Sequence, residues 1–244
     1  MRNKLLILVL NSLLIIALFS GSISAEENKL QMGVKSYNQG NYQQAINYLT
    51  EFAAENNQNY RVHYFLGLTY LKLDEYDLAI DSLKLSQKNR PDNYHIMVNL
   101  GRAYYNNNQY DKAKDILMQS KNMKTIDDQV YNLLGLIALN SQKYDDAVDN
   151  FQKAKEFDKD NYYIYNNLGY TFLLKGNYKQ AENNLKKAAD LNPPVAFIYN
   201  NLGIALENQG NLKEAIKYYK KALEVNSNYS KANKNLKRVE KKLN

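Results

Sequence analysis

The stretch YNNLGYTFLLKGNYKQAENNLKKAADLNP, residues 165–193, determines the fold of the chain. Its apolar side chains recur every three or four residues over 165–172, which places them on one face of a helix. Gly176 ends that helix, because glycine readily takes the left-handed conformation of a helix terminus. A second helix with the same spacing covers 178–188 and stops before Pro193, which has no N–H to donate. The stretch therefore predicts two antiparallel helices joined by a tight turn.

The same pattern recurs along the chain with a period of 34 residues. A marker glycine identifies each copy, at Gly33, Gly67, Gly101, Gly135, Gly169 and Gly203. An alanine follows each marker by twelve residues, at Ala45, Ala79, Ala113, Ala147, Ala181 and Ala215. Small residues at these two positions let the backbones of paired helices approach closely. Because one helix pair cannot bury its own apolar face, stacked copies are needed to complete the core.

Other positions keep the same register. Leucine precedes five of the six marker glycines, and tyrosine lies three residues before five of the six alanines. Pro91 and Pro193 both fall 24 residues after a marker. This pattern resembles the tetratricopeptide repeat family. The resemblance implies an all-α fold, a right-handed superhelical solenoid of antiparallel helix pairs. We delimit six repeats at residues 26–59, 60–93, 94–127, 128–161, 162–195 and 196–229.

The first 25 residues differ from the rest of the chain. Two basic residues precede an apolar run at 5–19, and small polar residues follow it. This is the layout of a secretory signal, so residues 1–25 are predicted to be a signal peptide that is cleaved after Ala25. A retained membrane anchor is the alternative, although the run is shorter than the roughly 20 residues that a spanning helix needs. We therefore expect an exported protein, periplasmic or secreted.

The formal net charge of +7 is concentrated near the C-terminus, where residues 230–244 hold six basic residues and one acidic residue. In the same segment Ala232, Leu236 and Val239 recur at helical spacing. The pattern predicts a basic capping helix that covers the last repeat, since the ends of a solenoid need a polar outer face. The functional alternative is attraction of Lys231–Lys242 to an anionic surface, such as anionic lipid or a cell-wall polymer.

The resemblance implies that the first helix of each pair lines a concave groove. On that face an asparagine precedes the Leu-Gly pair at Asn99, Asn167 and Asn201. An amide both donates and accepts, so such a row can hold a peptide backbone without reading its side chains. The other interpretation is that asparagine is simply common at this position of the family. The predicted groove residues are Tyr64, Phe65, Asn99, Arg102, Tyr105, Asn132, Asn166, Asn167, Tyr170, Asn200 and Asn201.

The sequence contains no arrangement typical of catalysis. The absence of cysteine excludes thiolate nucleophiles, Cys-ligated zinc and disulfides. His63 and His95 have no second histidine at metal-ligand spacing. The glycines after residue 25 all belong to the repeat, which leaves none for a phosphate-binding loop. We therefore expect no enzyme activity, no cofactor and no metal, with other proteins as partners and neither a small-molecule substrate nor nucleic acid.

These observations favour an exported scaffold that holds an extended peptide or a partner helix in its groove, in a setting such as envelope assembly. Two alternatives remain open at this point. One is an adaptor tethered to a membrane by its N-terminal segment, and the other is a protein that binds polyanions or surfaces through its basic tail. Fold alone does not choose between them, because one scaffold can carry many binding faces.

Overall fold

The computed structural model describes residues 25–121, 123 and 127–243. Those residues form thirteen helices and no strand, which confirms the all-α prediction. The helices of the first part are α2 (Ala25–Asn38), α3 (Tyr42–Glu55), α4 (Tyr60–Lys72), α5 (Tyr76–Asn89) and α6 (Tyr94–Asn106). Those of the second part are α7 (Tyr110–Lys121), α8 (Asp128–Asn140), α9 (Tyr144–Phe157), α10 (Tyr162–Leu174), α11 (Tyr178–Asp190), α12 (Ala196–Asn208), α13 (Leu212–Val225) and α14 (Ser230–Leu243).

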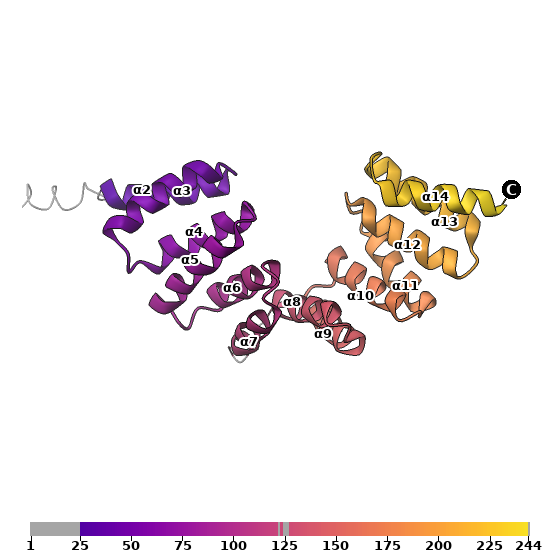
Figure 1. Cartoon of the computed structure of the whole chain (residues 1–244), viewed down its shortest axis with the longest axis horizontal. Coiled ribbons are helices and arrows are strands. Elements are labelled where there is room, and N and C mark those ends of the chain that lie inside the picture. The colour runs from indigo at the N-terminus through magenta and orange to yellow at the C-terminus, as the bar shows by residue number, and fades with distance from the viewer. Residues whose placement is uncertain (1–24, 122, 124–126, 244) are drawn as a thin grey trace, which may run out of the picture. The chain divides into compact units, whose positions relative to one another are not determined.

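The chain divides into two compact units, which we name unit 1 (residues 1–109) and unit 2 (residues 110–244). Within each unit, helices that follow one another in sequence pack against one another (Figure 1). The thirteen helices fit six helix pairs followed by α14. We call the even-numbered members of the pairs first helices and the odd-numbered members second helices. This consecutive packing of helix pairs confirms the predicted solenoid.

The marker glycines lie where paired helices cross. A Cβ atom on Gly67 would lie 2.5 Å from Cγ of Leu83 and 3.3 Å from the carbonyl oxygen of Ala79. A Cβ on Gly203 would lie 2.5 Å from Cε1 of Tyr219. Real Cβ atoms essentially never lie within 3.0 Å of such a neighbour, so each crossing admits only glycine at its present spacing. The close approach predicted from the paired glycine and alanine is confirmed.

The turn inside each helix pair contains a residue with positive φ. Three of these residues are glycines, Gly40, Gly176 and Gly210, with φ of 78°, 75° and 79°. Three equivalent positions carry Asp74, Asn108 and Gln142, with φ of 58°, 59° and 57°. The turn conformation is therefore set by the repeat, and half of the copies adopt it without glycine.

First helices also contact the first helices of neighbouring repeats, as α10 does with α8 and α12. No such contact joins successive second helices within the described parts of either unit. The first helices consequently lie on the inner side of the bend that each unit makes. The predicted signal, residues 1–25, lies outside the described residues except for Ala25, which begins α2. Among the described helices none is long and apolar enough to span a bilayer.

Candidate functional site

The first helices of unit 2 carry a row of asparagines that hydrogen-bond across repeats. Asn167 on α10 donates from Nδ2 to Oδ1 of Asn132 on α8 at 3.0 Å. Asn166 donates to Asn167 at 3.4 Å, and Asn201 on α12 donates to Asn166 at 3.0 Å. We name these four residues the amide row. Its links join side chains 35 residues apart, or adjacent ones, so the row continues from one repeat to the next.

The links of the amide row all run in the same direction, from Nδ2 of one amide to Oδ1 of the next, from Asn201 through Asn166 and Asn167 to Asn132. Asn166 is buried, whereas Asn132, Asn167 and Asn201 are half-buried. Each link uses one of the two N–H groups of the donating amide and one of the two oxygen lone pairs of the accepting amide. The half-buried amides therefore retain hydrogen-bonding capacity toward a ligand. The links hold these side chains in place before binding, which lowers the entropic cost of association.

Asn200 lies outside the amide row and forms a separate hydrogen bond to α14. It is only 2% exposed and accepts a hydrogen bond at Oδ1 from Asn235 on α14, at 2.9 Å. Its side chain joins the last repeat to α14 and is not accessible to a ligand. Sequence reasoning missed Asn235, although its 35-residue distance from Asn200 repeats the spacing of Asn166 and Asn201.

Aromatic side chains stand beside the amide row. Tyr163 and Tyr170, both on α10, are 46% and 41% exposed. The ring of Phe197 on α12 lies 6.4 Å from that of Tyr163, centroid to centroid. Tyrosine combines a large apolar surface with a hydroxyl that can hydrogen-bond, which suits a binding surface. The amide row with Tyr163 and Tyr170 is the amide face of unit 2.

The amide face is almost uncharged. Helix α10 contains no acidic or basic residue, α8 contains only Asp128, and α12 contains only Glu207. The lysines and acidic residues of this unit lie mainly on the second helices and on α14. A ligand on this face therefore meets amides, phenols and aliphatic groups, and long-range charge contributes little to its binding.

Glu207 is neutralised within the chain. Its side chain is only 8% exposed and pairs with Arg238 at 2.6 Å and Lys242 at 3.0 Å, both on α14. The hydroxyl of Tyr219 also donates to its carboxylate at 2.8 Å. Burial alone raises the pKa of Glu207, but the hydrogen bonds from Arg238, Tyr219 and Lys242 outweigh it and lower the pKa to about 2. Burial and the bond to Glu207 raise the pKa of Tyr219.

The predicted groove residues of unit 1 form a separate cluster. Asn99 on α6 is buried, donates to the hydroxyl of Tyr64 on α4 at 3.1 Å, and accepts from Arg102 at 3.0 Å. Phe65 meets Tyr64 edge to face, with ring centroids 5.6 Å apart. Tyr105 is half-buried on α6. Asn99 thus bonds within unit 1, whereas Asn167 and Asn201 are linked to each other through Asn166.

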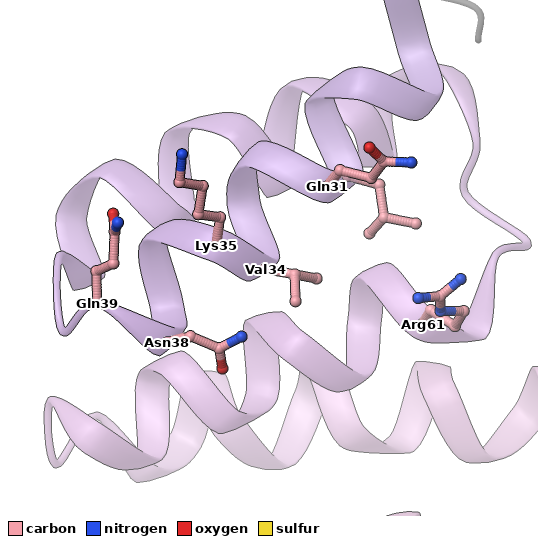
Figure 2. A pocket seen from close by; sticks show the side chains of 7 residues that line it. Gln31, Val34, Lys35, Asn38, Gln39 and Arg61 are labelled. Carbon is pink, nitrogen blue, oxygen red and sulfur yellow. The ribbon is translucent and has the colours of Figure 1, made fainter.

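Unit 1 also has a pocket of about 370 Å³ between α2 and α4. Its lining consists of apolar Leu30 and Val34, the amides Gln31, Asn38 and Gln39, and the cations Lys35 and Arg61. Figure 2 shows Arg61 on the helix opposite to the one that carries Lys35. This pocket is therefore cationic, in contrast with the uncharged amide face of unit 2.

A tetratricopeptide-repeat family model, described as the Cilia and flagella-associated protein 70 C-terminal domain, matches residues 15–240. The chain belongs to this tetratricopeptide-repeat family. The family resemblance predicted from the marker glycines is thereby confirmed. A comparison with curated proteins finds no match.

Several solved tetratricopeptide-repeat structures are similar to the chain. A chain of the APC/C hetero-tetramer Cut9-Hcn1 has a TM-score of 0.79 at 19% identity, over 94% of this chain and 46% of that one. This chain thus spans less than half of that protein's length. Pseudomonas aeruginosa pilF has a TM-score of 0.74 at 16% identity, over 86% of this chain and 96% of that one. YrrB, described as having an unusual peptide-binding site, has a TM-score of 0.57 at 16% identity, over 75% of this chain and 95% of that one. At these sequence identities, the structural similarity shows that the chain shares the fold of these proteins.

Proposed function

We propose that this protein is an exported scaffold that holds an extended segment of a partner protein on the amide face of unit 2. The tetratricopeptide-repeat fold supports protein–protein interaction in general. The observation that carries the finer proposal is the amide row, whose donors and acceptors are aligned across three first helices. An extended backbone offers alternating N–H and C=O groups, which are the complement of such a row.

The uncharged surroundings support backbone recognition over side-chain recognition. A face without charge has no means of selecting lysines or carboxylates, whereas amides bond to any backbone. Tyr163 and Tyr170 add apolar contact area at a low cost in side-chain entropy. YrrB, which is similar in fold, is described as a protein with a peptide-binding site, and this supports a peptide as the ligand. Envelope assembly is the setting that we propose for such an exported scaffold.

The test uses peptides selected by display against residues 26–244. The best peptide is labelled, and its dissociation constant is measured by fluorescence anisotropy. We expect Asn167→Ala to weaken binding about tenfold, the effect of losing one or two hydrogen bonds. Asn183→Ala, on the exposed surface of α11, is the matched control and should leave the constant unchanged.

Modification of the peptide separates backbone recognition from side-chain recognition. Backbone N-methylation at alternate positions removes N–H donors and should abolish binding, while substitution of the same side chains should be tolerated. Equal binding by wild type and Asn167→Ala would remove the amide face as the site. Tolerance of N-methylation would show that side chains are recognised instead.

Export is the second part of the proposal. It rests on the sequence of residues 1–25, where an apolar run is followed by small residues. The mass of the protein isolated from its native cells, with the sequence of its N-terminus, distinguishes the alternatives. A chain that begins at Glu26 in an extracytoplasmic fraction supports cleavage and export. A membrane-bound chain that retains the apolar run supports the tethered adaptor.

A further inference from the structure

The fourth repeat lacks a large side chain that its neighbours have. The position four residues before the turn residue of positive φ is occupied in repeats two to six by Tyr70, Tyr104, Ala138, Phe172 and Leu206, residues 34 apart. Phe172 and Leu206 are buried in the core of unit 2, and Ala138 belongs to the same core. Alanine at this position leaves the volume of an aromatic or leucine side chain unfilled.

The preceding helix, α7, departs from the repeat at two positions that face the same region. Lys114 stands where four other second helices carry Ile46, Ile80, Val148 and Ile216, and where α11 carries Glu182. Met118 stands where the others carry threonine, lysine or glutamine, and it is 44% exposed. Helix α7 also packs less closely on α8 than other second helices do on the helix that follows them.

These departures produce a pocket of about 310 Å³ between α7, α8 and α9. Its floor is apolar and buried and consists of Leu134, Ile137 and Ala138 from α8. Met118 contributes a flexible apolar wall from α7. An apolar floor with a polar rim is the usual anatomy of a site that receives an apolar group.

The rim of this pocket carries charges of both signs on each helical wall. Lys114 and Lys121 outnumber Asp111 on α7, whereas Asp146 and Asp149 outnumber Lys153 on α9, and Lys143 lies in the turn before α9. Lys121 also lies 5.6 Å from the centroid of the Tyr131 ring, which limits its freedom. A ligand that fits between these walls therefore pairs best when it carries both acidic and basic groups, with the acidic ones toward the two lysines of α7 and the basic ones toward the two aspartates of α9.

We propose that the pocket receives one bulky apolar side chain from an amphipathic helix of a partner protein. The repeat itself shows what fits, because Phe172 and Leu206 occupy the equivalent volume in the next two repeats. A helix placed between two helices can present such an anchor while its flanks meet the lysines and the aspartates. Met118 adapts to the shape of the anchor, since an unbranched thioether side chain is flexible. The site is separate from the amide face and does not depend on it.

The first experiment tests whether the pocket accepts an apolar group. Methionine methyl groups are labelled with ¹³C, and the protein is titrated with toluene, the analogue of a phenylalanine side chain. We expect a saturable shift of the Met118 resonance, no shift at the exposed Met32, and no shift at Met118 in Ala138→Phe. Ala138→Leu serves the same purpose should the phenylalanine variant unfold. Absence of a saturable shift, or an equal shift in the filled variants, would overturn the proposal.

The second experiment tests the occupant. A photo-crosslinking amino acid replaces Met118 in cells that make the protein, and the same replacement at Lys186, the equivalent exposed position of the fifth repeat, is the control. We expect a crosslinked product that forms at position 118 and is lost when Ala138→Phe is added. The partner peptide in that product should contain Phe, Tyr or Leu on a helix with acidic and basic flanks. A product that persists with Ala138→Phe, that also forms at Lys186, or that contains a second copy of this chain would contradict the proposed occupant.

Discussion

At position 142 a glutamine occupies a backbone conformation that favours glycine. Its φ is 57°, and the equivalent Gly176 in the next repeat has a φ of 75°. A residue with a Cβ in this region costs roughly 1 kcal/mol more than glycine. We therefore expect Gln142→Gly to raise the free energy of unfolding by about 0.5–1 kcal/mol, as measured by urea denaturation followed by circular dichroism.

The reverse substitution provides the control. Gly176→Ala introduces a Cβ at positive φ, although no atom lies within 4 Å of that Cβ. It should lower the free energy of unfolding by about 1 kcal/mol through backbone strain alone. A loss of stability in Gln142→Gly would show that the glutamine side chain makes a contribution that outweighs the strain.

Glu207 should make stability depend on pH. Its pKa falls from 4.5 to about 2 on folding, so its contribution is complete above pH 4.5 and is lost as the pH falls toward 2. We expect Glu207→Gln to lose about 2 kcal/mol at pH 7, a value reduced for the solvent exposure of Arg238 and Lys242. At pH 2 the difference from wild type should vanish in urea unfolding curves.

The matched control is Glu240→Gln, which removes an exposed ion pair with Lys220 at 3.7 Å. Such pairs contribute about 0.5 kcal/mol or less, so little change is expected at either pH. Parallel loss of stability in wild type and Glu207→Gln between pH 4.5 and 2 would show that other carboxylates dominate the acid response.

Individual residues also show where sequence reasoning reached its limit. Asn167 and Asn201 were predicted to form a row, and the structure links them through Asn166. Asn99 was predicted in the same row but bonds to Tyr64 and Arg102 within unit 1. The repeat register gives a position along the helix, whereas the partner of an amide depends on side-chain types in two neighbouring repeats. Whether the row binds a peptide stays a prediction.

At the scale of helices, the crossing of α4 and α5 depends on one missing methyl group. The Cβ of an alanine at position 67 would lie 2.5 Å from Cγ of Leu83. Alanine is the better helix former, but this overlap forces the helices apart. We expect Gly67→Ala to lower the free energy of unfolding by about 1–3 kcal/mol. Adding Leu83→Ala should recover part of the lost stability in double-mutant analysis, and a further additive loss would contradict the steric explanation.

The terminal helix α14 uses only part of its charge in the fold. Arg238 and Lys242 bind Glu207, whereas Lys231, Lys234, Lys237 and Lys241 remain exposed on its outer side. Ala232 and Val239 are buried against the last repeat. The capping interaction and the surface charge are therefore carried by different residues of one helix. If α14 acted only through its surface charge, it would not need its ion pairs with the buried carboxylate of Glu207.

At the scale of the molecule, the repeat period predicted the helices but not the division into two units. The 34-residue register continues without interruption through residues 109 and 110, so the marker residues give no sign of a boundary. The departures that loosen this region, Lys114 and Ala138, are ordinary helix residues in sequence. Only the packing between neighbouring repeats shows that they leave a pocket.

Two units with nearest-neighbour packing should unfold locally and independently. Stability in a solenoid is approximately a sum of terms within repeats and between adjacent repeats, so a defect affects its neighbours most. We expect Gly67→Ala to speed amide hydrogen exchange in α4 and α5 and to leave α12–α14 unchanged, and Glu207→Gln to do the reverse. Exchange of the full chain, measured by mass spectrometry of peptic fragments, provides both results. If either substitution accelerated exchange equally in both units, the chain would unfold as one cooperative body, and the division between residues 109 and 110 would have no energetic meaning.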